Sequence, residues 1–249
     1  MSRWLRCHHA DPSAALRLIC LPYAGAGASA YAGWSLPADL PVEVWAVQPP
    51  GRENRWGEEP FRRVEPLVLA LAAEMAPLLD RPFVLFGHSM GALLAFELVR
   101  RLRSEGCRDP ARLFLSAFRA PDLPPWRPPA SALPDDALLH RVYEMMGPAR
   151  NVVRDPDLLL AVAPTLRADL ELCETYSFSR EAPLTTPVTC FAAIDDPEVR
   201  VDEMAAWRRH TTTDCTMHTF TGGHLFLRDH EQELLTRIAA DVADLVPTW

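Results

Sequence analysis

The stretch FVLFGHSMGALLAFELVRRL, residues 83–102, places a G-x-S-x-G motif between an apolar run and a helical pattern. The continuous apolar run over 83–86 is typical of a strand that is covered on both faces. Ser89 then stands at a strand-to-helix turn, where Gly87 and Gly91 are needed because a Cβ atom would crowd the neighbouring strand and helix. A chance match in an ordinary loop would lack this context. The stretch therefore predicts a serine nucleophile at the end of a parallel strand.

Apolar runs and helical patterns alternate along the chain, as in βα units that build a mostly parallel sheet. Strands are expected at residues 16–21, 42–47, 83–86, 113–116, 188–192 and 216–220. Apolar residues at helical spacing over 64–79, behind Glu65 and Pro66, predict a helix that packs on this sheet. With 249 residues, 49% of them hydrophobic, the chain can bury one sizeable core. We expect a single α/β-hydrolase domain over residues 1–249.

Residues 120–187 interrupt the alternation. They open with the proline-rich APDLPPWRPPASALP and continue as amphipathic, helix-like segments around 138–146, 158–162 and 166–176. We expect this insertion, residues 120–187, to form a helical lid. The alternative is an extra helical layer that has no role beyond stability.

A serine hydroxyl needs a base at neutral pH, and in this fold an acid and then a histidine follow the serine along the chain. His224 is the expected base because it comes after Gly222-Gly223, just past the last apolar strand. The preceding strand leads into Asp195 and Asp196, and a buried carboxylate there would orient the imidazole. We favour Asp196 and keep Asp195 as the alternative. Weaker candidates are His210, His218 and His230 for the base, and Glu198 and Asp202 for the acid.

Two backbone amides are expected to receive the oxyanion that forms when the serine attacks. The Met90 amide lies at a helix N-terminus, and the Ala24 amide lies in a small-residue loop after the first strand. The same loop, residues 25–30, formally matches the dinucleotide fingerprint G-x-G-x-x-G/A. That fingerprint requires an acidic residue at the end of the second strand, whereas Glu43 stands at its start. Nucleotide binding is therefore disfavoured.

Composition narrows the partners and the chemistry. The net charge of -8 and the lack of segments that mix basic residues with aromatics argue against nucleic acid. The chain contains no lysine, which excludes lysine-based catalysis. No segment has the length of a signal peptide or a membrane span, so we expect a cytoplasmic protein without a membrane partner. Six scattered cysteines indicate reduced thiols, and the histidines lack metal-ligand spacing, so neither metal nor cofactor is expected.

The chain resembles the type II thioesterases associated with polyketide synthases and nonribosomal peptide synthetases, over nearly its whole length. Besides GHSMG, the resemblance rests on LPYAGAGASAY, VQPPGRENR, LRADLELCETY, DDPEV, MAAWRRHT and TGGHLFL. It implies a triad of Ser89, Asp196 and His224, an oxyanion hole made by the amides of Ala24 and Met90, and an insertion that shapes the acyl channel. It also implies that the substrate is an acyl group on the phosphopantetheine arm of a carrier protein. The implied role is editing, the removal of aberrant or stalled acyl units.

The sequence departs from the family pattern in places. Gly25-Ala26 replaces consecutive glycines, and no glycine precedes the acid in Ala192-Ala193-Ile194. SAFRAP, residues 116–121, retains Arg119 but has lost a second arginine, so Arg119 is either an anion-docking residue or an ion-pair partner. Rival functions are a carboxylesterase or lipase, a chain-terminating or cyclising thioesterase, and a binding protein with an idle triad. The chain starts at Met1 and ends just after its last helix, which favours a discrete protein, expected to be a monomer.

Overall fold

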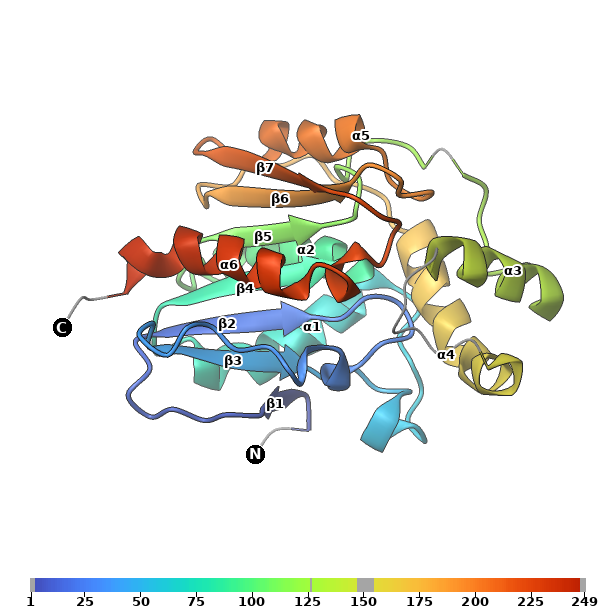
Figure 1. Cartoon of the computed structure of the whole chain (residues 1–249), viewed down its shortest axis with the longest axis horizontal. Coiled ribbons are helices and arrows are strands. Elements are labelled where there is room, and N and C mark those ends of the chain that lie inside the picture. Colours follow the sequence, from blue (N-terminus) through green and yellow to red (C-terminus); the bar gives the residue numbers. More distant parts are fainter. Residues whose placement is uncertain (1–2, 126, 147–154, 247–249) are drawn as a thin grey trace.

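A computed structural model describes residues 3–125, 127–146 and 155–246. Seven strands form one sheet in the order β1-β3-β2-β4-β5-β6-β7 (Figure 1). The pair β1–β3 is antiparallel, and the other neighbouring strands run parallel. The strands are β1 Leu5–Cys7, β2 Leu16–Leu21, β3 Val42–Val47, β4 Phe83–His88, β5 Leu113–Ser116, β6 Val188–Ala193 and β7 Cys215–Phe220. This is the α/β architecture that the alternating pattern predicted.

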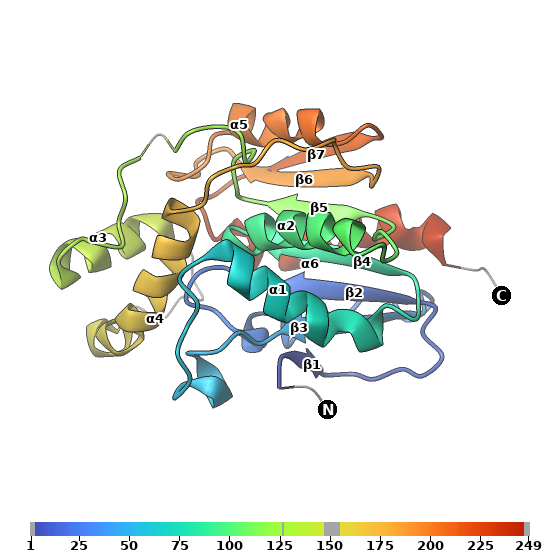
Figure 2. The same cartoon turned by 180° about the vertical axis from the view of Figure 1, so that it is seen from behind.

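Helices cover both faces of the sheet. Helix α6, Glu231–Val242, lies on one face (Figure 1), and α1, Val64–Met75, and α2, Met90–Ser104, lie on the other (Figure 2). The short helix α5, Val201–Ala205, packs on the same side as α1 and α2, where Met204 joins their apolar cluster. Side chains of β4 alternate between the two apolar layers, because successive residues of a strand point to opposite faces. The turn that carries Ser89 thus follows a strand that is anchored in both cores.

The sequence analysis missed β1. Three residues are too few to show a strand periodicity, and only the buried side chain of Leu5 and its pairing with Val47 reveal this edge strand. The predicted strands at 83–86, 188–192 and 216–220 are one or two residues longer in the structure. The helix predicted over 64–79 ends at Met75 and continues as a 3₁₀ turn over 76–78.

The insertion forms two helices beyond the carboxyl ends of the strands (Figure 1). These are α3, Asp135–Met146, and α4, Pro156–Glu174. The prediction of two separate segments at 158–162 and 166–176 was wrong, because α4 continues through Pro164. Pro164 is exposed. The carbonyl that loses its helical donor four residues earlier, at the exposed Leu160, can therefore bind water. Residues 126 and 147–154 of the insertion lie outside the described ranges.

Two general features of the described residues concern membrane spans and the oxidation state of the cysteines. None of their helices is both long enough and apolar enough to cross a bilayer. All six cysteines are free thiols, as the scattered spacing predicted.

Candidate active site

Ser89 occupies a strained turn between β4 and α2. Its backbone φ of 53° and ψ of -122° lie in a region that residues other than glycine rarely adopt. A Cβ atom on Gly87 would stand 2.0 Å from the carbonyl oxygen of Gly91, and one on Gly91 would stand 2.1 Å from the carbonyl oxygen of Leu21. Both contacts are to backbone atoms that cannot move aside. The two glycines of the motif are therefore required for β2, β4 and α2 to meet at this turn.

The structure brings together the three side chains that the sequence analysis favoured. The Ser89 hydroxyl lies 2.8 Å from Nε2 of His224, and Nδ1 of His224 lies 2.9 Å from Oδ2 of Asp196. Side chains of His224 and Asp196 are 3% and 1% exposed. Asp196 Oδ1 also accepts hydrogen bonds from the amides of Glu198 and Val199, at 2.7 and 3.2 Å. The carboxylate is thus held in place while it orients the imidazole.

The other candidates stand elsewhere. Asp195 is exposed, and its Oδ2 accepts a 3.3 Å hydrogen bond from the Gly222 amide. The other histidine candidates contact groups other than Ser89. His210 bonds to Asp122, His218 stacks on Phe191, and His230 lies beside Thr221 and Glu233. Asp202 pairs with Arg200. Among the acids weighed from sequence, Asp196 alone contacts His224 directly.

Burial and charge act in opposite directions on His224. Burial is the largest single influence on the pKa of His224 and by itself would lower it, but the raising influences, led by the adjacent Asp196 carboxylate, together leave this pKa above the ordinary value. Glu198 raises the pKa of His224 further, and Arg141 lowers it. The neutral imidazole can accept the serine proton through Nε2, and the imidazolium that results is stabilised by Asp196.

Sequence reasoning gave no role to His88, the residue before the nucleophile. Its Nε2–H donates to the carbonyl of His224 at 2.9 Å, and its Nδ1 accepts from the Ser116 hydroxyl at 2.8 Å. Burial holds the pKa of His88 well below its ordinary value, so the ring stays neutral and keeps this tautomer. His88 thereby fixes the backbone of the candidate base. Its place in the motif gave no signal of this, because the contact spans 136 positions of the chain.

Both expected oxyanion donors are available. Within the described ranges, neither the Ala24 amide nor the Met90 amide donates a hydrogen bond to another residue. Ala24 lines the same cavity as Ser89 and His224, and Met90 is the first residue of α2, where backbone amides have no helical partner. An oxygen that becomes negative when Ser89 attacks a carbonyl can therefore be met by two preorganised donors.

The cavity beside Ser89 has a volume of about 140 Å³. Its apolar wall comes largely from the loop after β5, which contains Phe118, and from the insertion, which contains Pro125 and Leu170. An apolar cavity of about 150 Å³ holds a benzene-sized molecule, roughly six heavy atoms. The cavity beside Ser89 thus has room for a group of about that size.

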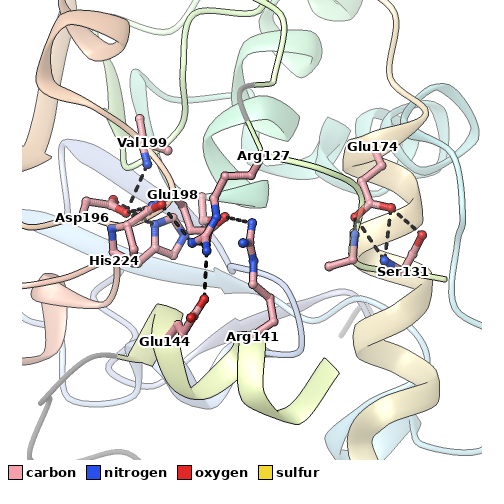
Figure 3. A network of polar contacts seen from close by, with 12 residues as sticks. Arg127, Ser131, Arg141, Glu144, Glu174, Asp196, Glu198, Val199 and His224 are labelled. Carbon is pink, nitrogen blue, oxygen red and sulfur yellow. Dashed lines mark hydrogen bonds and ion pairs between the residues drawn. The ribbon is translucent and has the colours of Figure 1, made fainter. Parts of the chain in front are cut away.

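Figure 3 shows a charged network whose members Arg127, Arg141 and Glu198 line this cavity. Glu198 accepts from Arg127 of the loop before α3 and from Arg141 of α3, each at 2.8 Å. Arg127 also donates to Glu144 at 2.9 Å. Burial raises the pKa of Glu198 even though His224 and Arg141 oppose that shift. The network joins the insertion to the loop that carries Asp196.

Arg119 also lines the cavity. Its Nε donates to the Leu123 carbonyl at 3.0 Å, and its guanidinium lies 5.2 Å from the centre of the Phe118 ring. No carboxylate in the described ranges forms an ion pair with Arg119. This absence argues against the alternative that Arg119 serves as an ion-pair partner. Burial lowers the pKa of Arg119.

The loop that matched the dinucleotide fingerprint does not open a long helix. It leads into a four-residue 3₁₀ turn, Ala28–Tyr31, whereas a pyrophosphate is bound at the N-terminus of a full helix. In the part of the chain that is described, no group of three or more His, Cys, Asp or Glu residues is arranged to hold a metal ion.

Comparison with known proteins gives a consistent result. The thioesterase domain family matches residues 16–242. The gramicidin S biosynthesis protein GrsT of Aneurinibacillus migulanus is 34% identical over 94% of this chain and 92% of its own length. Thioesterase PikA5 of Streptomyces venezuelae is 37% identical over 95% of this chain and 84% of its own. The structure of the type II thioesterase BorB from the borrelidin biosynthetic cluster matches with a TM-score of 0.86 and 35% identity, covering 95% of this chain and 96% of BorB.

Proposed function

Since this chain belongs to the thioesterase domain family, we propose that it hydrolyses acyl thioesters with Ser89 as nucleophile, His224 as base and Asp196 as the acid that orients it. The observation that carries the proposal is the continuous chain of contacts from the Ser89 hydroxyl through His224 to the buried Asp196. A serine on a strained turn with two free amides beside it is arranged for acyl transfer.

The reaction follows from this arrangement in two halves. Ser89 Oγ attacks the thioester carbonyl while His224 Nε2 takes its proton, and the oxyanion accepts hydrogen bonds from the amides of Ala24 and Met90. When the tetrahedral intermediate collapses, the C–S bond breaks and His224 protonates the departing thiolate. A water molecule, deprotonated by the same histidine, then attacks the acyl-serine. The bond between the acyl carbon and Ser89 Oγ breaks, His224 returns the proton to Oγ, and the free acid is released. Every proton transfer runs through His224, and the sequence of steps uses no metal or cofactor.

The acyl donor in this proposal is the phosphopantetheine arm of a carrier protein in a polyketide or nonribosomal peptide synthase. Support comes from relatives that are named for gramicidin S and borrelidin biosynthesis. The small cavity beside Ser89 agrees with removal of short, aberrant or stalled acyl units. A synthase partner of this kind would place the enzyme in the cytoplasm.

The insertion has a proposed role in this reaction as the wall of the acyl cavity. Leu170 and Cys173 of α4 and Met145 of α3 line the cavity beside Ser89. The network of Arg127, Arg141 and Glu198 ties that wall to the triad loop. The insertion would then select the acyl group rather than act only as an added layer.

The test is hydrolysis of acyl groups from a phosphopantetheinylated carrier protein, measured beside matched oxygen esters. Wild type, Ser89→Ala and Ser104→Ala are compared; Ser104 is an exposed serine at the far end of α2. We expect carrier thioester cleavage in wild type and Ser104→Ala and none in Ser89→Ala. Cleavage of oxygen esters alone would indicate an esterase instead, and a wild type inactive on both would indicate an idle scaffold.

A further inference from the structure

A buried ion pair joins the insertion to the loop after β3. Nη1 and Nη2 of Arg52 donate to Oδ2 and Oδ1 of Asp169 on α4, at 2.5 and 2.9 Å. The two side chains are 4% and 2% exposed. This is a two-pronged arginine–carboxylate contact, the geometry that fixes direction as well as distance.

The same two side chains also hold the turn that carries Ala24. Asp169 Oδ2 accepts a 2.8 Å hydrogen bond from the Gly25 amide, and Arg52 Nη1 donates to the Ala26 carbonyl at 3.2 Å. The turn itself is closed by the Ala26 amide, which donates to the Tyr23 carbonyl at 3.0 Å. Gly25 has a φ of +78°, as the third residue of a type II turn requires. The ion pair therefore grips the two residues that directly follow Ala24.

We propose that Arg52 and Asp169 are positioning residues that set the Ala24 amide at the distance the oxyanion requires. This inference rests on the proposed thioesterase function and deepens it, because it makes helix α4 of the insertion part of the oxyanion hole's support. Catalytic donors act only when neighbouring groups lock their geometry, and a misplacement of about 1 Å can cost roughly 100-fold in rate.

A purely structural role would predict different contacts. Buried ion pairs are weak sources of stability, because desolvation of both charges offsets their attraction. A pair kept only to fasten α4 would need no bond to the turn. Glu171 offers the comparison: it lies on the same helix and binds Arg62 and Arg63 at the surface, at 2.8 Å each, without a hydrogen bond to the turn.

The experiment removes the grip without leaving a buried charge. In Arg52→Met/Asp169→Leu, apolar side chains of similar size replace the pair, so the fold is retained while the Gly25 amide loses its acceptor. In Arg52→Met/Asp169→Asn, an amide oxygen can still accept from Gly25. Glu171→Gln is the matched control on the same helix. Each protein is assayed with a short acyl thioester of N-acetylcysteamine, and active sites are counted by titration with a fluorophosphonate.

Two further readouts separate positioning from stability: the melting temperature, and the inhibition constant of an alkyl trifluoromethyl ketone. Serine adds to that ketone and places an alkoxide in the oxyanion hole. For the Leu double variant we expect kcat per active site to fall about 100-fold, with KM within about threefold and ketone affinity falling in parallel with kcat. The Asn double variant should recover at least about tenfold of that loss, and Glu171→Gln should match wild type.

The proposal is overturned if the Leu double variant keeps its kcat per active site, or if it loses only titratable sites and melting temperature. Equal losses in the Leu and Asn variants would also contradict it, since the bond to Gly25 would then not matter. Failure of the thioesterase function itself is a different result, because wild type would then be inactive in the same assay.

Discussion

The Nε2 atom of His88 lies 2.9 Å from the carbonyl oxygen of His224, so the residue before the candidate nucleophile holds the backbone of the candidate base. Both rings are buried, and their centres are 5.5 Å apart. The carbonyl of His224 would otherwise face an apolar interior without a donor. The contact thus links the segment that carries Ser89 to the backbone of His224, the two partners of the Ser89–His224 hydrogen bond.

His88→Leu should therefore slow the reaction without removing any group of the proposed triad. A His224 carbonyl left without a donor lowers the free energy of unfolding by about 1–3 kcal/mol. The backbone around it then shifts, and this shift displaces the His224 imidazole. We expect kcat to fall about tenfold, together with a lower melting temperature. His88→Gln, which retains a side-chain donor, serves as the control and should recover part of both losses. Wild-type kcat in His88→Leu would show that the triad does not need this support.

The two neighbouring aspartates should respond very differently to neutralisation. Asp196→Asn keeps the shape of the site but removes the carboxylate that fixes the imidazole, and we expect kcat to fall by about 10³-fold or more. Asp195→Asn changes an exposed side chain that accepts a hydrogen bond from the Gly222 amide, so we expect an effect within about threefold. Steady-state kinetics on one acyl thioester compares them. A larger loss in Asp195→Asn would reverse the assignment.

The pH profile should report His224. Only the neutral imidazole accepts the serine proton, so kcat/KM should rise with pH through the pKa of His224, which lies above the ordinary value of about 6.5. Glu198 raises this pKa and Arg141 lowers it. Glu198→Gln should therefore move the acidic limb to lower pH, and Arg141→Gln should move it to higher pH. Shifts in the same direction in both variants would show that the limb belongs to another group.

Close backbone approach at the turn that carries Ser89 predicts that one added methyl group strongly lowers stability. Gly91→Ala sets a Cβ 2.1 Å from the Leu21 carbonyl oxygen, whereas a Cβ on Gly57 meets nothing within 4 Å. We expect the free energy of unfolding in urea to fall by about 3 kcal/mol or more for Gly91→Ala. Gly57→Ala should stay within about 0.5 kcal/mol of wild type. Similar values for the two would mean that β2 and α2 can separate without cost.

The wall of the proposed acyl cavity predicts a change in chain-length preference. Leu170→Ala shortens a side chain that lines the cavity of about 140 Å³. The cavity becomes larger, so longer acyl chains gain room. We expect the ratio of kcat/KM for octanoyl over butyryl thioesters to rise about tenfold. Leu160→Ala, at an exposed position of the same helix and away from this cavity, is the matched control. An unchanged ratio in Leu170→Ala would place the acyl chain elsewhere.

Much of the fold was predictable because its signals are local. The run over 83–102 contains its own strand, turn glycines and helix, and the other buried parallel strands are short apolar runs whose composition reflects burial on both faces. The chain order serine, acid, histidine then directed attention to Asp195, Asp196 and His224. The edge strand β1 and the passage of α4 through Pro164 escaped, because three residues carry no period and the exposure of Pro164 is decided by packing.

The sequence by itself determined which residue types reach the carboxyl end of the sheet, since strands, turns and helices arise from neighbours along the chain. Tertiary structure decided which of those residues touch. Asp196 rather than Asp195 meets His224 across 28 positions, His88 meets its backbone across 136, and Arg52 meets Asp169 across 117. These contacts depend on the directions in which separate elements emerge from the core, and side-chain direction in three dimensions is fixed by packing rather than by local pattern.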